Sequence, residues 1–237
     1  MAVAFDAQGH VDDAVPVATL SSSTIITVGS GSNRALIVGL CFGNATGLPT
    51  GITVVWDFGG SNQSMTAITN AAIANTDLGS VAMFGLIAPV SGQKTLKATW
   101  TGSRHIAMGA ISFTGVDQTG GATSFPNGNH AVNNSGSTTA SVTITSATGN
   151  MTAAYFCNGG GTNFSSTSAT QDWLDTACTA AANHTAGSAS NVMTATVSAS
   201  DTWVAVGCDI LAAGSGPAFL AAPNIPILQA VKRAAYW

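Results

Sequence analysis

The sequence predicts an all-β protein built from antiparallel sheets. Thr, Val, Ile and Ala alternate in short runs that end at Gly, Asn or Ser, which is the pattern of strands and turns. Only 7% of the residues are charged, against roughly 25% in an ordinary domain, and Glu is absent. Helix surfaces are normally built from Glu, Lys, Gln and Arg, so this composition argues against a helical bundle.

The expected strands follow one another with turn residues in almost every gap. Glycine-rich stretches at 29–31, 59–60 and 159–161 mark three of these turns. Only the last dozen residues and residues 70–75 have a pattern that suits a helical turn. The expected strands are 24–28, 35–42, 51–56, 64–68, 81–87, 95–100, 105–113, 141–145, 151–157, 191–197 and 202–211.

A weak internal repeat relates the two halves of the chain. Residues 33–41 (NRALIVGLC) correspond to residues 149–157 (GNMTAAYFC), and each half ends in a pair of strand-like runs. We expect one sandwich, residues 1–213, in which both halves contribute strands to both sheets, because either half alone has a small core. Two small tandem sandwiches are the alternative.

The composition excludes several classes of partner. A net charge of −4 and six scattered Lys and Arg side chains provide no basic face for nucleic acid. No run reaches about 18 apolar residues, so we expect no transmembrane helix and no membrane partner. The N-terminus has neither a basic region nor a long apolar run, so we expect no secretory signal. A hydrophobic fraction of 46% argues against disorder.

The four cysteines are expected to be free and buried. Cys41, Cys157 and Cys208 lie in apolar strand-like runs, Cys178 stands apart, and the sequence contains no Cys-x-x-Cys pair. The wide spacing argues against a zinc site. Free thiols in such runs pack as small hydrophobic side chains. A disulfide remains an alternative that only geometry decides.

No motif for catalysis is present, and we expect neither enzymatic activity nor a cofactor. The sequence lacks a G-x-S-x-G nucleophile elbow, and it has no pair of glutamates for glycoside chemistry. His105, His130 and His184 are isolated in sequence. A triad assembled in space from distant residues is left open.

Two stretches carry acidic side chains close together. Residues 10–13 (His-Val-Asp-Asp) form a cluster in which a divalent cation is conceivable, but a polar N-terminal loop without a metal is the favoured interpretation. Asp172 and Asp175 flank Trp173, and an aromatic ring beside acids is a feature of sugar-stacking sites. These three residues are the candidate ligand-facing group, although packing of the tryptophan on the sandwich is the favoured interpretation.

Other single residues are assigned structural roles. Asp117 follows Gly115 at the exit of a strand, so we expect its side chain to accept a nearby backbone N–H in an Asx turn. Trp56, Trp100 and Trp203 lie within expected strands and are assigned to the core or a sheet face.

The tail differs from the rest of the chain. Residues 214–237 lose the alternation and contain three of the seven prolines, so we expect an extended C-terminal arm that leaves the sandwich. An exposed apolar segment of this kind is avoided by soluble monomers, which predicts docking on a neighbouring subunit or another protein. Packing of the arm on its own sandwich is the alternative. The assembly residues of the arm are Phe219, Leu220, Ile225, Ile227, Leu228, Val231, Lys232, Arg233, Tyr236 and Trp237.

Several motifs together resemble those of a known group of proteins. They are Asn33-Arg34, residues 55–60 (VWDFGG), Met65-Thr66, residues 83–89 (MFGLIAP) and residues 109–119 (GAISFTGVDQT). Their order resembles a group of β-sandwich proteins encoded by tailed bacteriophages and by bacteria, in which the Ser-Phe-x-Gly-Val-Asp-Gln-Thr stretch is the most specific piece. The resemblance covers residues 1–120 well and residues 137–212 loosely. It implies a jelly-roll-like, two-sheet sandwich and does not imply one activity.

The resemblance and the composition together suggest a function. We expect a structural protein of a phage particle. This protein would be a capsid decoration, a fibre-like part or a tail-associated component. Such a protein is located in the virion, forms a homo-oligomer and contacts other virion proteins. The alternative is a carbohydrate-binding or surface-adhesion module whose partner is a cell-surface glycan, and an enzyme ranks third.

Overall fold

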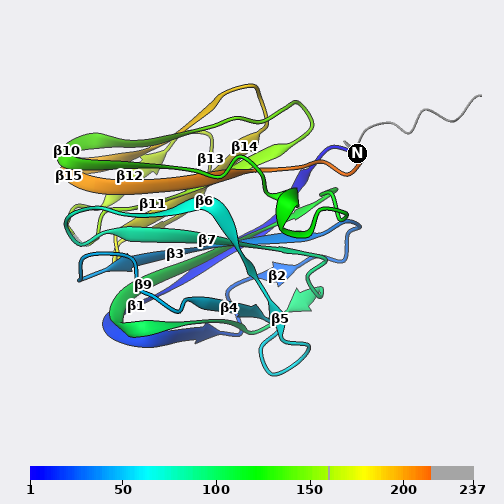
Figure 1. The fold of residues 1–237 in the computed structure, drawn as a ribbon, viewed down its shortest axis with the longest axis horizontal. Coiled ribbons are helices and arrows are strands. Elements are labelled where there is room, and N and C mark those ends of the chain that lie inside the picture. The colour runs from blue at the N-terminus through cyan, green and yellow to red at the C-terminus, as the bar shows by residue number, and fades with distance from the viewer. Residues whose placement is uncertain (160, 215–237) are drawn as a thin grey trace, which may run out of the picture.

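The computed structural model describes residues 1–159 and 161–214, and in this part of the chain it contains two large antiparallel sheets (Figure 1). The first sheet comes entirely from the N-terminal half. Its strands are β1 (Ala4–Ser22), β3 (Ala35–Gly43), β4 (Thr53–Trp56), β5 (Gln63–Ser64), β6 (Thr66–Ala74), β7 (Ser80–Ile87) and β9 (Leu96–Thr114).

The second sheet comes entirely from the C-terminal half. A third, two-stranded sheet pairs β2 (Thr27–Val28) with β8 (Gly92–Gln93), and the helical content of the described residues is one 3-10 turn at Gly121–Ser124. The strands of the second sheet are β10 (Asn129–Ile144), β11 (Met151–Cys157), β12 (Phe164–Thr167), β13 (Thr170–Asp175), β14 (Ala180–Ala186) and β15 (Asn191–Ile210). The prediction of an all-β fold with antiparallel sheets is therefore confirmed.

The two sheets have the same strand order, which makes the weak repeat in the sequence a structural duplication. In the first sheet, β1 and β4 pair with β9, followed by β3, β7 and β6. In the second, β10 and β12 pair with β15, followed by β11, β14 and β13. Cys41 in β3 and Cys157 in β11 stand at equivalent positions. Gly85 in β7 and His184 in β14 are also equivalent, because Gly85 pairs with Ile37 and His184 pairs with Ala153, and each of these partners lies four residues before the cysteine of its strand.

One expectation about the halves is wrong. We expected each half to contribute strands to both sheets, but each half forms one sheet of its own. Within each half, strands distant in sequence pair with one long strand: β1, β3 and β4 pair with β9, and β10, β11 and β12 pair with β15. The long strands β9 and β15 therefore complete each sheet within the half that contains them.

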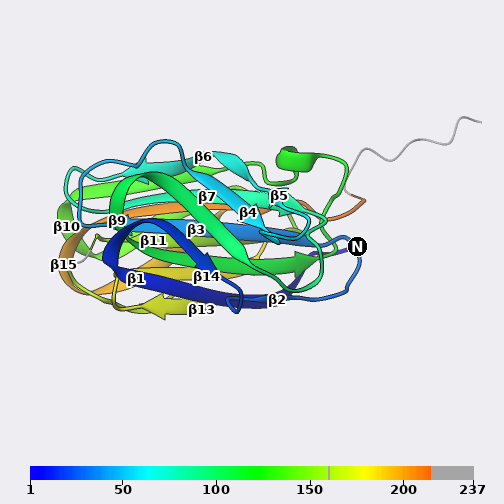
Figure 2. The same ribbon diagram turned by 90° about the horizontal axis from the view of Figure 1, so that it is seen from below.

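The core lies in three clusters of buried side chains. The first lies between the sheets and takes side chains from both halves, including Ile37, Ile111, Tyr155 and Val206. The second belongs to the first half alone and the third to the second half alone. Each half therefore buries residues on both faces of its sheet, and the shared cluster joins the halves. Seen from below, the strands of both sheets run along the long direction of the molecule (Figure 2).

The edges of the sheets meet along two seams. In the β1–β13 seam, the Nε2 of His10 lies 3.7 Å from a carboxylate oxygen of Asp175. In the β6–β10 seam, the Nδ1 of His130 lies 2.9 Å from the carbonyl oxygen of Asn70. The two seams are equivalent under the duplication, because β1 of the first sheet corresponds to β10 of the second, and β6 of the first corresponds to β13 of the second.

The cysteines are free and buried, as expected. Cys41 and Cys157 face each other between the sheets. The thiol of Cys41 lies 3.6 Å from the carbonyl oxygen of Phe156, and that of Cys157 lies 3.5 Å from the carbonyl oxygen of Phe42.

Two local expectations are wrong. Residues 10–13 belong to the long strand β1 and do not form a loop, because this polar stretch pairs along β9. Residues 70–75 do not form a helical turn, because residues 70–74 belong to β6 and its irregular pairing with β7. The expected strands at 95–100 and 105–113 are parts of one strand, β9, and those at 191–197 and 202–211 are parts of β15.

Candidate functional site

The ten assembly residues assigned to the arm lie outside the described residues. The structure does describe the point from which the tail continues. The amino group of Met1 donates a hydrogen bond to the carbonyl oxygen of Ala213 at 2.8 Å, and Val116 and Ala212 form an isolated bridge. The tail therefore continues from a point beside the N-terminus, after both sheets are complete.

The three candidate ligand-facing residues lie on β13 at the β1–β13 seam, and they point inward. Asp172, Trp173 and Asp175 are only 8%, 4% and 4% exposed. The pairing of β13 with β14 shifts register between Gln171 and Trp173, and this bulge buries two neighbouring side chains.

Trp173 packs within the shared core. Its ring stacks on His10 with a centroid distance of 5.1 Å and lies 5.9 Å from the ring of Tyr155. It also covers Gly109, where an added Cβ would lie 2.6 Å from the indole Nε1. The packing role favoured from the sequence is confirmed. A buried ring offers no face to a sugar, so the structure lends no support to sugar stacking on Trp173.

The carboxylate of Asp175 links β1 to the turn after β13. It accepts a hydrogen bond from the backbone N–H of Cys178 at 2.7 Å and lies 3.7 Å from the imidazole of His10. Burial raises the pKa of Asp175 above its usual value, and the nearby charge of Asp12 adds to this, while His10 opposes it. Burial and the charge of Asp175 raise the pKa of the Cys178 thiol to about 12, so this thiol is protonated and unreactive at neutral pH.

A second histidine–aspartate pair lies beside the first, and sequence reasoning missed it. His184 Nδ1 lies 2.7 Å from an Asp172 carboxylate oxygen, and the imidazole stacks on Phe5 at 4.6 Å. Burial raises the pKa of Asp172, although the hydrogen bond and charge of His184 act in the opposite direction. The other Asp172 oxygen is buried and has no partner within the described chain. The pair connects β13 to β14, and Phe5 of β1 covers it.

Within residues 1–159 and 161–214, no three His, Cys or Asp side chains are grouped closely enough to hold a metal ion. Asp12 and Asp13 do not act together. Asp13 accepts a hydrogen bond from the N–H of Val15 at 2.9 Å, and Asp12 is exposed.

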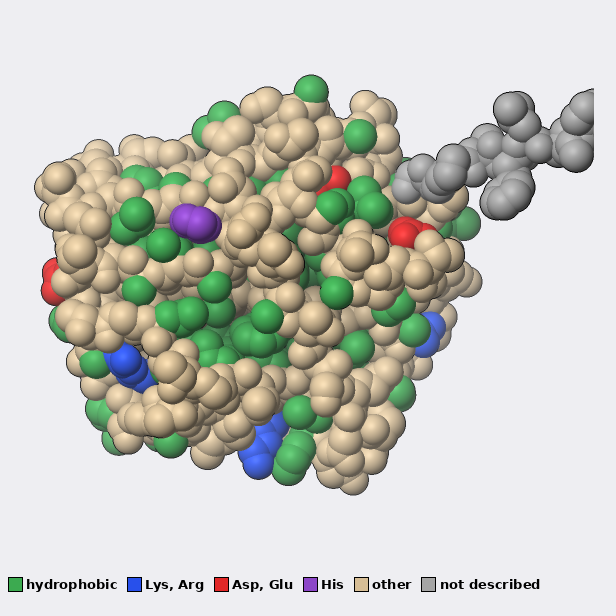
Figure 3. Space-filling model, viewed as in Figure 1, with side chains coloured by type: hydrophobic (Ala, Val, Ile, Leu, Met, Phe, Trp, Pro, Cys, Tyr) green, Lys and Arg blue, Asp and Glu red, His purple; other side chains and the backbone are tan. Residues whose placement is uncertain are grey.

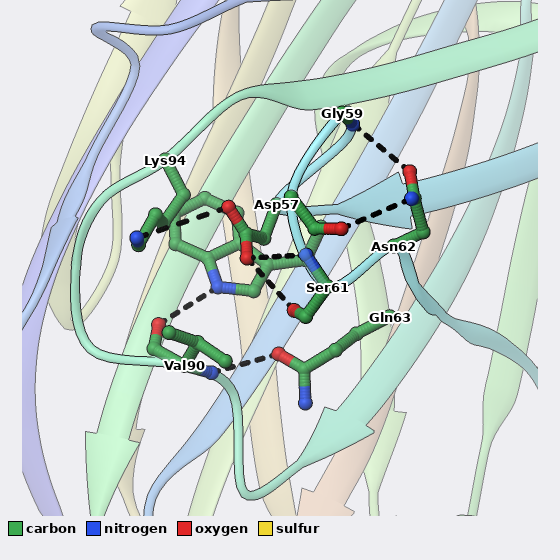
Figure 4. Close-up of polar contacts among 9 residues, drawn as sticks. Asp57, Gly59, Ser61, Asn62, Gln63, Val90 and Lys94 are labelled. Carbon is green, nitrogen blue, oxygen red and sulfur yellow. Dashed lines mark hydrogen bonds and ion pairs between the residues drawn. The ribbon is translucent and has the colours of Figure 1, made fainter.

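The loop between β4 and β5 is a rigid polar turn (Figure 4). One carboxylate oxygen of Asp57 accepts hydrogen bonds from the N–H and the hydroxyl of Ser61, both at 2.8 Å. These bonds lower the pKa of Asp57, and Lys94, at 3.8 Å, adds to the effect. Asn62 accepts from the N–H of Gly59 at 2.9 Å. The turn presents Phe58, 44% exposed, with the Lys97 ammonium 4.0 Å from the centre of its ring.

The residues that carry the family resemblance brace the end of the first sheet. The amide of Gln118 donates to the carbonyl oxygen of Arg34 at 3.1 Å, and Val116 N–H donates to the carbonyl oxygen of Asn33 at 2.9 Å. Asp117 forms the expected Asx turn, since it accepts from the N–H and hydroxyl of Thr119 at 3.2 and 2.9 Å. Burial alone would raise the pKa of Asp117, but these hydrogen bonds outweigh it and lower the pKa. The motif has a scaffolding role in this fold.

The remaining aromatic and histidine residues that the sequence singled out lie apart from one another. Trp56, Trp100 and Trp203 are buried in the second and third core clusters, as expected. His105 pairs within the first sheet, where its backbone N–H donates a hydrogen bond to the side-chain oxygen of Asn44. His130 lies in the β6–β10 seam.

A solvent-open hollow of about 370 Å³ lies at the β6–β10 seam, and none of the candidate site residues named from the sequence lines it. We name it the β6 hollow. It is formed by the bulge of β6 and by the 3-10 turn and linker that precede β10. Its main lining residues are Thr69, Asn70, Thr123, Phe125, Pro126 and Asn127. None of these is charged, and a space-filling view shows few charged side chains on the wider face (Figure 3).

Comparisons with known proteins place the chain in no family. No model of a known protein family matches the sequence, and no curated protein matches it. The described residues contain no helix with the length and apolar character needed to span a membrane.

Proposed function

We propose that this chain is a structural component of a tailed-bacteriophage particle and that it acts through assembly contacts. Capsid decoration, a fibre-like part and a tail-associated part are the three forms that this role can take. The observation that carries the proposal is the division of the chain at Ala213. Among the described residues, both sheets and the three core clusters are built from residues up to Ala212, and the apolar sequence of 214–237 follows in the chain.

Three further features support an assembly role. The fold joins its two halves through one shared core, which suits a rigid building block. Only ten acids and six bases are present, so copies packed side by side repel one another weakly. The motif at residues 109–119, which resembles that of the phage-encoded group, makes structural contacts through Gln118 and Asp117.

A truncation tests the proposal. Removal of residues 215–237 should leave a folded β protein, because both sheets and the shared core cluster are formed by described residues that precede them, but the truncated protein should no longer assemble. Circular dichroism measures the fold, and analytical ultracentrifugation measures the assembly state. A truncated protein that assembles like the full chain would contradict the proposal, and so would one that misfolds.

A full-length variant provides the matched control. Ile227→Ser together with Leu228→Ser keeps the length and charge of the tail and removes two apolar side chains. We expect weaker assembly at unchanged thermal stability. Unchanged assembly in this variant would show that the apolar residues of the tail do not form the contact.

A further inference from the structure

The β6 hollow lies where the two duplicated halves differ. Between the pairs Ala67–Phe84 and Ala72–Ala82, β6 advances five residues while β7 advances two. Between Gln171–Asn183 and Leu174–Ala181, the equivalent strand β13 advances three residues while β14 advances two. β6 therefore has two more bulged residues than its counterpart, and Thr69 and Asn70 of this bulge line the hollow.

The opposite wall consists of the 3-10 turn and the linker between the halves. Phe125 fixes this wall, because its ring lies against Gly85, where an added Cβ would be 2.5 Å from Cε2. Gly128 lies directly against the carbonyl oxygen of Thr69, so the linker sits on the bulge.

The hollow is formed in advance of any ligand. Asn70 and Asn127 have left-handed backbone conformations, with φ of 61° and 54°. Asn127 donates from its side-chain amide to the carbonyl oxygen of Thr145 at 2.9 Å, which fixes the side chain. Pockets for small molecules are typically preformed and have volumes of about 300–1,000 Å³. At about 370 Å³, the β6 hollow is at the lower end of this range and suits one small unit.

The chemistry of the lining selects a neutral ligand with both polar and apolar parts. A charged ligand would lose its hydration without gaining an opposite charge, because none of the lining residues is charged. Two amides and the hydroxyl of Thr69 offer both donors and acceptors, and the hydroxyl of Thr123, which donates to the carbonyl oxygen of Gly120 at 2.9 Å, offers an acceptor. In the described chain, no hydrogen bond involves the side chain of Asn70 or the Oδ1 of Asn127. Pro126, which is half-buried, supplies an apolar surface beside these groups, and the ring of Phe125, only 4% exposed, is held against Gly85.

We propose that the β6 hollow binds a neutral sugar that carries an acetamido group. The amide of such a sugar matches the donor and acceptor of Asn70 or Asn127, and its methyl group contacts Pro126. The ring hydroxyls pair with Thr69 and Thr123. This binding site is independent of the assembly role proposed above.

The test is a titration of the isotope-labelled full chain with N-acetylglucosamine, followed by NMR. Backbone amide signals of Asn70, Thr123 and Asn127 should shift together. Glucose, which lacks the acetamido group, should bind at least about fivefold more weakly, the loss expected for one hydrogen bond. The anionic N-acetylneuraminic acid should also bind more weakly. Equal binding of glucose would overturn the proposal, as would tighter binding of a short N-acetylated peptide.

Two matched variants locate the site. Asn70→Gly and Asn127→Gly remove an amide, but glycine adopts the same left-handed backbone conformation, so the fold should be retained. At least one of the two should weaken binding about fivefold. Asn62→Gly makes the same change at another left-handed position, in the β4–β5 loop, and should leave binding unchanged. Binding that is unaffected in both hollow variants would overturn the proposal, and so would the absence of any shift on titration of the unaltered chain.

Discussion

Two glycines of the first sheet lie under aromatic rings of the second, and replacing one of them tests the packing of the shared core. Gly39 and Gly109 are paired across β3 and β9. An added Cβ on Gly39 would be 2.5 Å from Cε1 of Tyr155, and one on Gly109 would be 2.6 Å from Nε1 of Trp173. Neither ring has free space to move into, since Tyr155 and Trp173 also contact each other.

The substitution Gly109→Ala should therefore destabilise the protein by overpacking. Such overpacking typically costs about 1–3 kcal/mol, and the short approach to a buried ring places this variant toward the upper end. Trp173→Ala alone should cost about 3–5 kcal/mol through the cavity it leaves. In the double variant the added methyl group enters the space left by the ring. The two effects should then fall short of additivity by at least about 1 kcal/mol.

The duplication supplies a control pair. Gly85 lies under Phe125 in the same way, and β3 separates Gly85 from Gly109. Gly85→Ala combined with Trp173→Ala should be additive, because neither residue touches the other. Urea unfolding followed by circular dichroism gives the free energy of each variant. Additivity in the Gly109–Trp173 pair, or a Gly109→Ala variant as stable as the parent, would refute the packing argument.

Three further predictions concern titratable groups and metals. Burial raises the folded-state pKa of Asp172, so the folded protein binds this proton more tightly than the unfolded chain, and stability falls as pH rises through that pKa. Asp172→Asn should remove this loss, so the melting temperature of the variant should fall less than that of the parent as pH rises through that pKa; the same pH dependence in both would contradict this. The buried thiols of Cys41, Cys157, Cys178 and Cys208 should react with a thiol reagent only after denaturation, and rapid reaction of the native protein would show that a thiol is accessible. Chelation by EDTA should leave the melting temperature unchanged, whereas a drop of several degrees would reveal a bound cation.

Apolar strands could be predicted from the sequence, and polar edge strands could not. The strand at 151–157 was predicted with its observed bounds, because its residues are buried on both faces and form an apolar run. β1 was missed, since Ala4–Ser22 contains Asp12, Asp13 and Pro16 and is exposed along much of its length. Its pairing with β9 depends on contacts distant in sequence, which a local pattern does not contain.

The candidate sites were harder to predict than the strands. Asp117 and its Asx turn were found because the capping group and the capped N–H are two residues apart. His184 and Asp172 are twelve residues apart and meet only because β13 and β14 pair. The β6 hollow has no local sequence pattern at all, since a bulge at Asn70 and a linker at Asn127 form it together.

Comparison of the two duplicated halves distinguishes contacts that both seams share from features that occur in one seam only. Both seams require an aromatic side chain over the facing sheet, and Phe5 over His184 and Phe125 over Gly85 meet this need at equivalent places. In the β1–β13 seam, the neighbouring space is filled by the imidazole of His184 and its carboxylate partner. In the β6–β10 seam, glycine replaces the histidine, two residues are added to the bulge, and a hollow remains open. The bulge also takes part in this seam, since the carbonyl oxygen of Asn70 lies 2.9 Å from the Nδ1 of His130. The hollow beside it is open to solvent, whereas the acids of β13 are buried, and this is why we look for a ligand at the β6 hollow.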